Sequence, residues 1–354
     1  MKRIALILAF VLFLFGSYPS SARQIKVATY NVQNLFDLVK DGTEYEDYIP
    51  NNRLGWDKKT AEIKYKNIAK VIKDLSADII ALQEVESRRA LKRLRDRLCK
   101  EGLCYKFMAI ADTKSSAVKC ALLSRFPIIS KKEIFVRNAS RSILAVKLLI
   151  EGKVLIVYVN HWKSKRGPES MRLPYARALR RAIDQLPKKL DFILLGDFNS
   201  NYNEYMTFLH HQDLNDTHGL TGINHILLTL KNGRLVTERD LMMEPSCRYL
   251  YNLWLELPPS RRWSYNLFGR KGTPDHIIIP ASLYDDAGIS YMDNSFRKFA
   301  PHYLFRHHGV FQWQRAEYGR GKHLGRGYSD HLPLYAWFST TEPPKGRASR
   351  YLAQ

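Results

Sequence analysis

Hydrophobic residues recur along the chain at two spacings, which predict a mixture of helices and strands. In residues 57–75 the apolar side chains follow one another at steps of four, three, four and three, which places them on one face of a helix. Further helices are expected over 87–98, where the sequence is strongly basic, and over 174–186, where Pro174 suits the first helical turn. Short apolar or alternating runs predict strands at 25–30, 78–82, 105–110, 118–124, 143–150, 153–160, 191–195, 275–279 and 332–338.

The order of these elements predicts the architecture. Many strands with few helices between them indicate an α/β protein whose sheets are partly antiparallel. Residues 200–270 and 284–327 lack a regular pattern and are expected to form large loops. Because no internal repeat and no Pro- or Ser-rich linker divides the chain, one domain is predicted over 23–340, followed by a flexible basic tail, 341–354.

The first 22 residues have the three-part pattern of a secretory signal peptide. Lys2 and Arg3 precede the apolar run 4–16, and small residues lead up to Ala22, after which we expect cleavage. The apolar run is shorter than the roughly 17–25 residues that span a bilayer, although an uncleaved anchor is the alternative. The protein is therefore expected to be exported, to the periplasm or outside the cell, as a monomer without a stable membrane span.

Four cysteines are too few for a disulfide-stapled scaffold in a chain of 354 residues. Export would permit disulfides, and the short spacing of Cys99 and Cys104 predicts a local bridge worth about 2 kcal/mol in the chain-entropy model. Cys120 lies in an apolar run and is expected to be a buried thiol, whereas Cys247 has no evident partner. No pair has the spacing of a zinc site.

Six strand-like runs end in polar residues that would be unusual choices for packing. These residues are Asn31, Glu84, His161, Asp197 with Asn199, Asp275, and Asp330 with His331. Loops beyond strand ends commonly carry active sites, so these side chains are expected to share one cleft. Their oxygens suit Mg²⁺, Mn²⁺ or Ca²⁺, and imidazoles beside such an ion can move protons to or from water. The combination fits metal-assisted hydrolysis of phosphoesters.

The motifs around these residues resemble the endonuclease/exonuclease/phosphatase superfamily, which has the deoxyribonuclease I-like fold, and its secreted bacterial nucleases in particular. The motifs are Tyr-Asn-Val-Gln-Asn, Leu-Gln-Glu-Val, Asn-His-Trp-Lys-Ser-Lys, Gly-Asp-Phe-Asn, Asp-His-Ile and Ser-Asp-His-Leu-Pro, and they occur in the family's order between residues 25 and 338. The resemblance implies a four-layer α/β sandwich in which two mixed β-sheets pack face to face with helices outside.

The resemblance also implies a role for each matching residue. Asn31, Glu84 and Asp330 would hold the divalent cation. His331 would be the general base, oriented by Asp275, while Asp197 and Asn199 would position water and phosphate or hold a second metal. His161 would hydrogen-bond the phosphate and could act as general acid. Some relatives pair this histidine with an acid from an earlier strand or loop; the sequence identifies no such partner here, Asp112 being a weak candidate. The other histidines, among them His210, His211, His276, His307 and His308, are assigned no role.

The charge balance favours a polyanionic partner. The chain has 56 basic and 34 acidic residues, a net charge of +22, or +20 once Lys2 and Arg3 are removed. Phosphate backbones attract such surfaces, and the affinity then falls steeply with salt. Two basic groups adjoin the motifs and are predicted to grip the backbone of a nucleic acid: Lys163, Lys165 and Arg166, and the Gly-rich group of Arg320, Lys322 and Arg326. The charges on 87–98 are interpreted as a solvated helix face.

These features predict an exported, divalent-metal-dependent nuclease with low sequence specificity, acting on DNA or, less favoured, RNA. A sphingomyelinase-like phosphodiesterase of phospholipids or inositol phosphates is the alternative within the superfamily, although no exposed apolar hairpin follows the signal region. A third reading is a catalytically inactive nucleic-acid-binding relative. The presence of Glu84, Asp330 and His331 disfavours it. The composition, with 45% hydrophobic residues, excludes a disordered chain.

Overall fold

A computed structural model describes residues 23–340, except for 114, 115, 188, 245, 247, 268, 286 and 308. The predicted signal peptide, the predicted basic tail and Cys247 lie outside the described residues. Nothing in the structure therefore tests those expectations.

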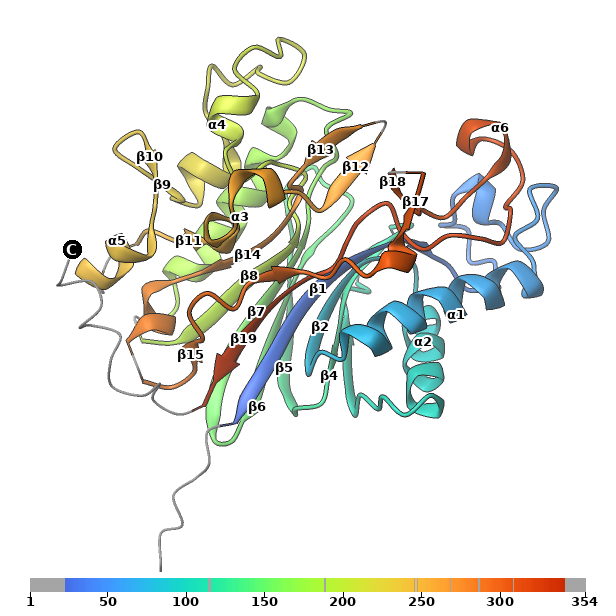
Figure 1. Ribbon diagram of the computed structural model, residues 1–354, viewed down its shortest axis with the longest axis horizontal. Coiled ribbons are helices and arrows are strands. Elements are labelled where there is room, and N and C mark those ends of the chain that lie inside the picture. The colour runs from blue at the N-terminus through green and yellow to red at the C-terminus, as the bar shows by residue number, and fades with distance from the viewer. Residues whose placement is uncertain are drawn as a thin grey trace, which may run out of the picture.

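Two large β-sheets form the centre of the molecule (Figure 1). One has the order β15 (Ser290–Tyr291), β19 (Leu334–Ser339), β1 (Gln24–Leu35), β2 (Ile79–Val85), β4 (Lys119–Ser124) and β3 (Phe107–Ile110), with β16 (Arg297–Lys298) also paired to β19. The other has the order β11 (Tyr251–Asn252), β14 (Asp275–Ile279), β8 (Asp191–Asp197), β7 (Lys153–His161), β6 (Ile143–Ile150) and β5 (Ile128–Ile134). Each sheet is mixed, because β1 pairs in parallel with β2 and β7 with β8, whereas the other pairings within them are antiparallel.

Helices cover the outer faces of the two sheets. Helices α1 (Lys58–Leu75) and α2 (Arg88–Lys100) pack against the β1 sheet, and α3 (Leu173–Asp184) packs against the β7 sheet. The Asp57 side chain caps α1 by accepting a hydrogen bond from Thr60 N at 2.8 Å, as expected of an Asp at a helix start. The three long helices that the sequence predicts are therefore confirmed, each within a few residues of its predicted bounds.

Smaller elements lie in the long connections. They comprise α4 (Glu204–Thr207), α5 (Glu238–Met243), α6 (Ala316–Gly319), and the hairpins β9 (Leu230–Lys231)–β10 (Arg234–Leu235), β12 (Tyr265–Leu267)–β13 (Arg270–Gly272) and β17 (Phe305–Arg306)–β18 (Gly309–Val310). Single helical turns occur at Glu46–Tyr48, Glu169–Met171, Gly222–Ile226, Leu253–Glu256, Pro259–Arg261, Ala281–Tyr284 and His302–Leu304. The expectation of large loops over 200–270 and 284–327 is thus confirmed, with short elements inside them.

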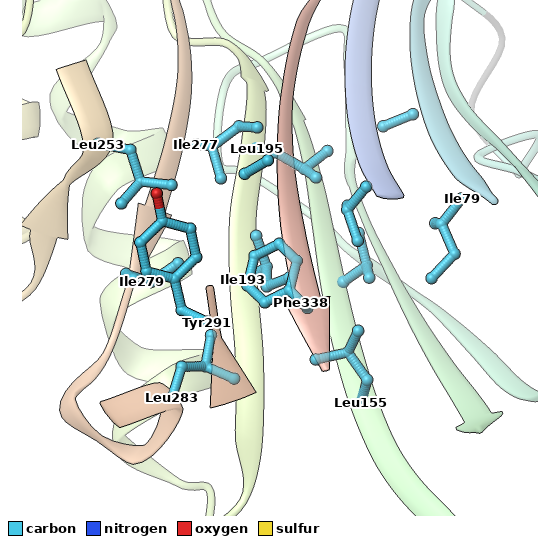
Figure 2. Packing of buried hydrophobic residues seen from close by; sticks show 14 of the residues in the cluster. Ile79, Leu155, Ile193, Leu195, Leu253, Ile277, Ile279, Leu283, Tyr291 and Phe338 are labelled. Atoms are coloured by element: carbon cyan, nitrogen blue, oxygen red, sulfur yellow. The ribbon is translucent and has the colours of Figure 1, made fainter. Parts of the chain in front are cut away.

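The largest hydrophobic cluster fills the space between the two sheets (Figure 2). Ile79 and Phe338 extend into it from one sheet and Leu155, Ile193 and Ile277 from the other, and all are fully buried. A second cluster lies between the β1 sheet and helices α1 and α2, and a third between the β7 sheet and α3. The arrangement of helix, sheet, sheet and helix confirms the predicted four-layer α/β sandwich.

The sequence pattern did not predict strand β5. Its central residues, Ser130, Lys131, Lys132 and Glu133, are polar, and most of the strand is exposed. β5 lies at the edge of its sheet, where backbone pairing with β6 alone defines the strand. An edge strand of this kind lacks the apolar signal on which the sequence pattern depends, and charged side chains there discourage pairing with other chains.

The structure confirms the predicted cysteine chemistry within the described residues. Cys99 and Cys104 form a disulfide that closes the end of α2, and Cys120 is a buried free thiol. No helix among the described residues is long and apolar enough to cross a bilayer.

Replacing Cys99 and Cys104 together with serine should lower the free energy of unfolding by about 2 kcal/mol, because the bridge closes only a short loop of the unfolded chain. Urea unfolding at equilibrium measures this change through the midpoint at constant slope. The same experiment on Cys120→Ser serves as a comparison that breaks no bridge. An unchanged midpoint in the double variant would show that the bridge contributes nothing.

Candidate active site

The polar strand ends meet where the two sheets adjoin. β1 and β2 bring Asn31 and Glu84 from one sheet, and β7, β8 and β14 bring His161, Asp197 and Asp275 from the other. Strand register sets the second group side by side, since Asp197 pairs directly with both His161 and Asp275. Asp330 and His331 enter from the segment just before β19. With Asn199, which follows Asp197 by two residues, the structure brings the eight residues of the predicted catalytic and metal groups to one region.

A bulge directs Glu84 toward this region. The pairing of β2 with both neighbours shifts register around Glu84, whose φ of 66° lies in the left-handed region that non-glycine residues rarely adopt. Its carboxylate accepts hydrogen bonds from Asn31 Nδ2 at 3.2 Å and from Asn34 N at 2.9 Å. Local strain of this kind concentrates at functional sites, where the surrounding structure maintains it.

The Asn31 amide links the two sheets. Its Nδ2 donates to Glu84 on the neighbouring strand and to Asp197 Oδ2, across the interface, at 3.0 Å. Its Oδ1 accepts from Gln33 N at 3.0 Å. As the amide is placed, Asn31 holds two carboxylates at a fixed separation and presents its nitrogen to them, so its predicted role as an oxygen ligand stays a prediction.

His331 and Asp275 form a buried pair. His331 Nδ1 lies 2.8 Å from Asp275 Oδ2, which also accepts a hydrogen bond from Ser264 Oγ at 2.6 Å. The other ring nitrogen, Nε2, lies 3.9 Å from the carboxylates of both Asp197 and Asp330. Burial by itself would lower the pKa of His331, but the carboxylates of Asp275, Asp330 and Asp197 raise it well above its usual value. Asp275 thus fixes Nδ1 of the ring, while Nε2 is directed into the cluster of carboxylates.

His161 approaches the carboxylates from β7. Its Nε2 lies 3.6 Å from Glu84 Oε1 and 3.7 Å from Asp197 Oδ2, and its buried Nδ1 has no hydrogen-bond partner among the described residues. Burial, aided by the positive charges of Arg141 and His331, lowers the pKa of His161 well below its usual value. A neutral imidazole has one N–H to donate, which suits a contact with a phosphate oxygen.

Asp112, the weak candidate for an acidic partner of His161, pairs with Lys131 instead. Its carboxylate accepts a hydrogen bond from Lys131 Nζ at 2.8 Å on the partly exposed edge of the molecule. The carboxylates that approach His161 are Glu84 and Asp197, which come from other strand ends. The sequence alone did not indicate which acidic residue the fold would bring close to the His161 ring.

The Gly-Asp-Phe-Asn motif ends β8 in a tight turn. Asp197 Oδ1 accepts from Asn199 N at 2.8 Å, and Asn199 Nδ2 donates to Trp162 O at 3.1 Å. Gly196 has a φ of +126°, and a Cβ atom there would lie 2.2 Å from the carbonyl oxygen of Asn160. Only glycine fits at that position, because both the backbone conformation and the close approach of β7 exclude a side chain.

The acidic groups of the cluster carry more negative charge than the nearby cations balance. Burial raises the pKa of Glu84, and the Asp330 charge raises it further. Burial also raises the pKa of Asp197, with Asp275 and Glu84 adding to the effect. One atom each from Asp197, Asp275 and His331 lie within 4.8 Å of one another, a spacing that could hold a metal ion. The donor set of carboxylate oxygens and imidazole therefore fits a divalent cation, which would favour the charged carboxylates.

The predicted basic residues differ in whether their charges are already paired within the protein. Lys165 donates to the buried carboxylate of Glu204 at 2.7 Å, whereas Arg166 is exposed and close enough to influence the pKa of Tyr265 beside His331. Lys163 is half-buried. Arg320, Lys322 and Arg326 are exposed on a loop that contacts the 47–54 region through hydrogen bonds.

The charges on α2 follow the expectation of a solvated face. Arg93 and Arg97 both pair with Glu62 on α1, and Lys92 pairs with Asp96. These arginines are thus paired with carboxylates of the same surface, which argues against this surface as a binding site for nucleic acid.

Four residues at or beside the site escaped the sequence analysis. Arg141 lies close enough to lower the pKa of both Glu84 and His161, and donates to Trp162 O at 3.2 Å. Ser264 hydrogen-bonds Asp275, and the Tyr265 ring lies tilted against that of His331, with 4.9 Å between their centroids. Lys64, fully buried on α1, donates to Tyr328 O at 2.8 Å, and burial lowers its pKa to about 7. Only Lys64 carried a sequence signal, as a lysine near the apolar face of its helix.

Comparison with known proteins agrees with this arrangement. The model of the Endonuclease/Exonuclease/phosphatase family matches residues 26–340, nearly the whole described chain. The chain belongs to the endonuclease/exonuclease/phosphatase family. Enzymes of this family hydrolyse phosphodiesters and other phosphate esters, typically with divalent metal ions, and the Asp197, Asp275 and His331 cluster of this chain is a candidate metal site. A search of curated protein sequences finds no match.

Solved structures of the endonuclease/exonuclease/phosphatase family share the fold. A humanized D. rerio TDP2 superposes with a TM-score of 0.55 at 14% identity, over 89% of this chain and 98% of that one. ANGEL2, described as a 2′,3′-cyclic phosphatase, gives 0.53 at 17% identity, over 90% and 96%. D. rerio TDP2 complexed with a single-strand DNA product gives 0.52 at 13%, over 89% and 98%. At these identities the similarity establishes the fold alone.

Proposed function

We propose that this protein is an exported nuclease that hydrolyses the phosphodiester bonds of nucleic acids, DNA above all, with a divalent cation and with little sequence preference. The observation that carries the proposal is the His331–Asp275 pair, whose free ring nitrogen faces carboxylates with His161 on their other side. That arrangement supplies a base, a set of oxygen ligands and a phosphate contact within one cluster of side chains. The net charge of +22 and the DNA product bound by D. rerio TDP2 support nucleic acid as the substrate.

Each side chain has a task in this mechanism. His331 removes a proton from the attacking water through Nε2, while Asp275 keeps Nδ1 protonated and stabilises the imidazolium that forms. Asp197 and Asn199 orient the water and the scissile phosphate. His161 donates its N–H to a phosphate oxygen, and its lowered pKa makes this contact its main task rather than proton donation. No stable partner chain is required, and a monomer is expected.

Glu84, Asp330 and Asn31 would hold the cation, with Mg²⁺ favoured over Mn²⁺ and Ca²⁺. A bound divalent cation would neutralise charge that develops on the phosphate. Hard oxygen donors suit Mg²⁺, which usually binds proteins through one or two carboxylates together with substrate phosphate.

The direct test is an assay of residues 23–354, purified, on supercoiled plasmid, linear DNA, RNA and sphingomyelin, each with Mg²⁺ or with EDTA. Nicking of the closed circle that EDTA stops would support an endonuclease, and loss of linear DNA alone would indicate an exonuclease. Turnover of sphingomyelin without any turnover of nucleic acid would replace the proposal with the phospholipid alternative. No turnover of any substrate would favour an inactive relative.

Replacing Arg141 with alanine should reduce kcat/KM for DNA by about 10- to 100-fold, because a charge-assisted hydrogen bond to phosphate contributes roughly 1.5–3 kcal/mol. Arg141 is half-buried beside Glu84 and His161, where a phosphate would lie in this mechanism. Initial rates over a range of DNA concentrations measure the change. Arg137→Ala, an exposed arginine of the same segment, is the matched control. Equal rates for the two variants would remove Arg141 from the site.

The exposed loop before Asp330 offers a test of backbone binding. Changing Lys322 and Arg326 to alanine should weaken binding to all DNA sequences alike and reduce the salt dependence of log Kd by a slope of about 2, if each contacts one phosphate. Fluorescence anisotropy with catalysis blocked by EDTA measures this at several salt concentrations. An unchanged slope would show that the loop lies outside the binding surface.

A further inference from the structure

We propose that the protein has a second cation site, selective for Ca²⁺, formed by Asp41, Glu44 and Glu86 outside the catalytic cleft. Asp41 and Glu44 lie in the loop that joins β1 to α1, and Glu86 directly follows β2. One carboxylate oxygen of each residue lies within 4.8 Å of those of the others. That span matches oxygens arranged around a Ca²⁺ ion, whose ligands lie at about 2.3–2.6 Å.

The buried Glu86 carboxylate provides independent support for a ligand. The residue is fully buried, and its Oε1 has no hydrogen-bond partner among the described residues. Its other oxygen, Oε2, accepts from Asp37 N at 2.6 Å. A buried polar oxygen without a partner is costly, and a buried carboxylate is costlier still. A cation between Glu86 and the two loop acids would give that oxygen its missing partner.

The local charge balance also leaves room for a divalent ion. Asp37 lies beside the three proposed ligands, so four carboxylates share this region. Asp37 already accepts hydrogen bonds from Ser87 Oγ at 2.7 Å and Arg89 Nε at 3.0 Å. Lys119 directs its Nζ to the main-chain oxygens of Glu86 and Ser116 instead of to a carboxylate.

Arg89 and Lys119 are thus the cations that contact this region in the described part of the chain, and the four acidic side chains outnumber them. A divalent cation would offset that excess of acidic groups. Exposed Asp41 and half-buried Glu44 leave the open side of such a site to water. An all-oxygen site with flexible loop ligands suits Ca²⁺ better than Mg²⁺, which requires a near-ideal octahedron at about 2.0–2.1 Å.

An ion here would act on the catalytic site through the backbone. Glu86 is two residues beyond Glu84, and the same loop carries Tyr45, whose pKa is raised by burial and by the nearby Glu84 charge. Binding would fasten this loop, drawn in blue at the right of Figure 1, to the end of β2. The site is therefore a positioning site, and its existence does not depend on which phosphoester the enzyme hydrolyses.

The test separates this site from the catalytic one by using the variant Glu84→Gln as the background. Differential scanning calorimetry of the whole purified chain, with and without Ca²⁺, should show a rise in Tm of about 5 °C for both the wild type and Glu84→Gln at Ca²⁺ concentrations roughly 100-fold above Kd. Isothermal titration should detect one Ca²⁺ bound to Glu84→Gln.

Adding Asp41→Asn and Glu44→Gln to this background should abolish both the Tm shift and the bound Ca²⁺. These loop residues are exposed or half-buried, so the variants should fold even if Glu86→Gln does not. Glu46→Gln, which removes a carboxylate two residues along the same loop that is paired only loosely with Arg53 at 3.8 Å, is the control and should keep the shift. The proposal is overturned if Glu84→Gln binds no Ca²⁺, or if the loop variants bind it as tightly as the control.

Discussion

Replacing His331 with alanine should lower kcat by about 10²- to 10⁴-fold, the usual contribution of a general base. The variant loses the ring nitrogen that faces Asp197 and Asp330, while Asp275 and Ser264 retain their mutual hydrogen bond. In the wild type, kcat/KM should rise with pH as His331 loses its proton, since only the neutral ring can accept one. The rising limb should be absent in the variant. Plasmid nicking over a range of pH measures both effects.

Two comparisons make the result specific to proton transfer. His211→Ala, an exposed histidine in a distant loop, should leave the rate and its pH dependence unchanged. Thermal unfolding should show that His331→Ala remains folded. A His331 variant with near-wild-type turnover would remove this residue from the mechanism and leave the cluster without an identified base.

Replacing Glu84 with glutamine should reduce kcat/KM at a fixed, low Mg²⁺ concentration by about 10³-fold, equivalent to roughly 4 kcal/mol of lost charge stabilisation. Glutamine has nearly the same shape, but its single amide oxygen can accept only one of the two hydrogen bonds that the carboxylate accepts from Asn31 and Asn34. The change therefore removes charge with little loss of packing. Rates measured against Mg²⁺ concentration should show a lower maximal rate and a smaller response of the rate to Mg²⁺ than in the wild type.

Glu62→Gln provides the matched control, because it removes a carboxylate from the α1–α2 surface and should leave the Mg²⁺ dependence unaltered. EDTA should abolish the activity of the wild type and of this control. If Glu84→Gln responded to Mg²⁺ as the wild type does, the cation would have to bind elsewhere, and the cluster of Asp197, Asp275 and His331 would be the next candidate.

The sequence predicted most of the fold because each central strand and long helix is buried on at least one face. The apolar pattern of Tyr65, Ile68, Ile72 and Leu75 follows directly from packing against the β1 sheet. The edge strand β5 has no such buried face, and only its backbone pairing with β6 defines it as a strand. The local sequence pattern therefore predicted the buried strands and missed this exposed edge strand.

The candidate site divides in the same way. Its strand-end residues were visible because each interrupts an apolar run at one end of a strand. Arg141 and Ser264 lie in loops and Tyr265 begins the short strand β12, and tertiary packing alone brings them to His331 and His161. The acids beside His161 come from other strands, and the sequence did not identify them as its neighbours. The positive φ of Glu84 likewise depends on pairing with two neighbouring strands.

The Asn31 hydrogen bond across the two sheets has a consequence for variants far from the cleft. Because the reacting groups are divided between the sheets, the side chains packed between the sheets set their separation, among them Phe338 and Ile193. A cavity made deep in that interior can let one sheet slide against the other without unfolding the protein. Catalysis would then fail while the overall structure persists, so loss of activity in a mutational survey would mark interior positions as well as chemical ones.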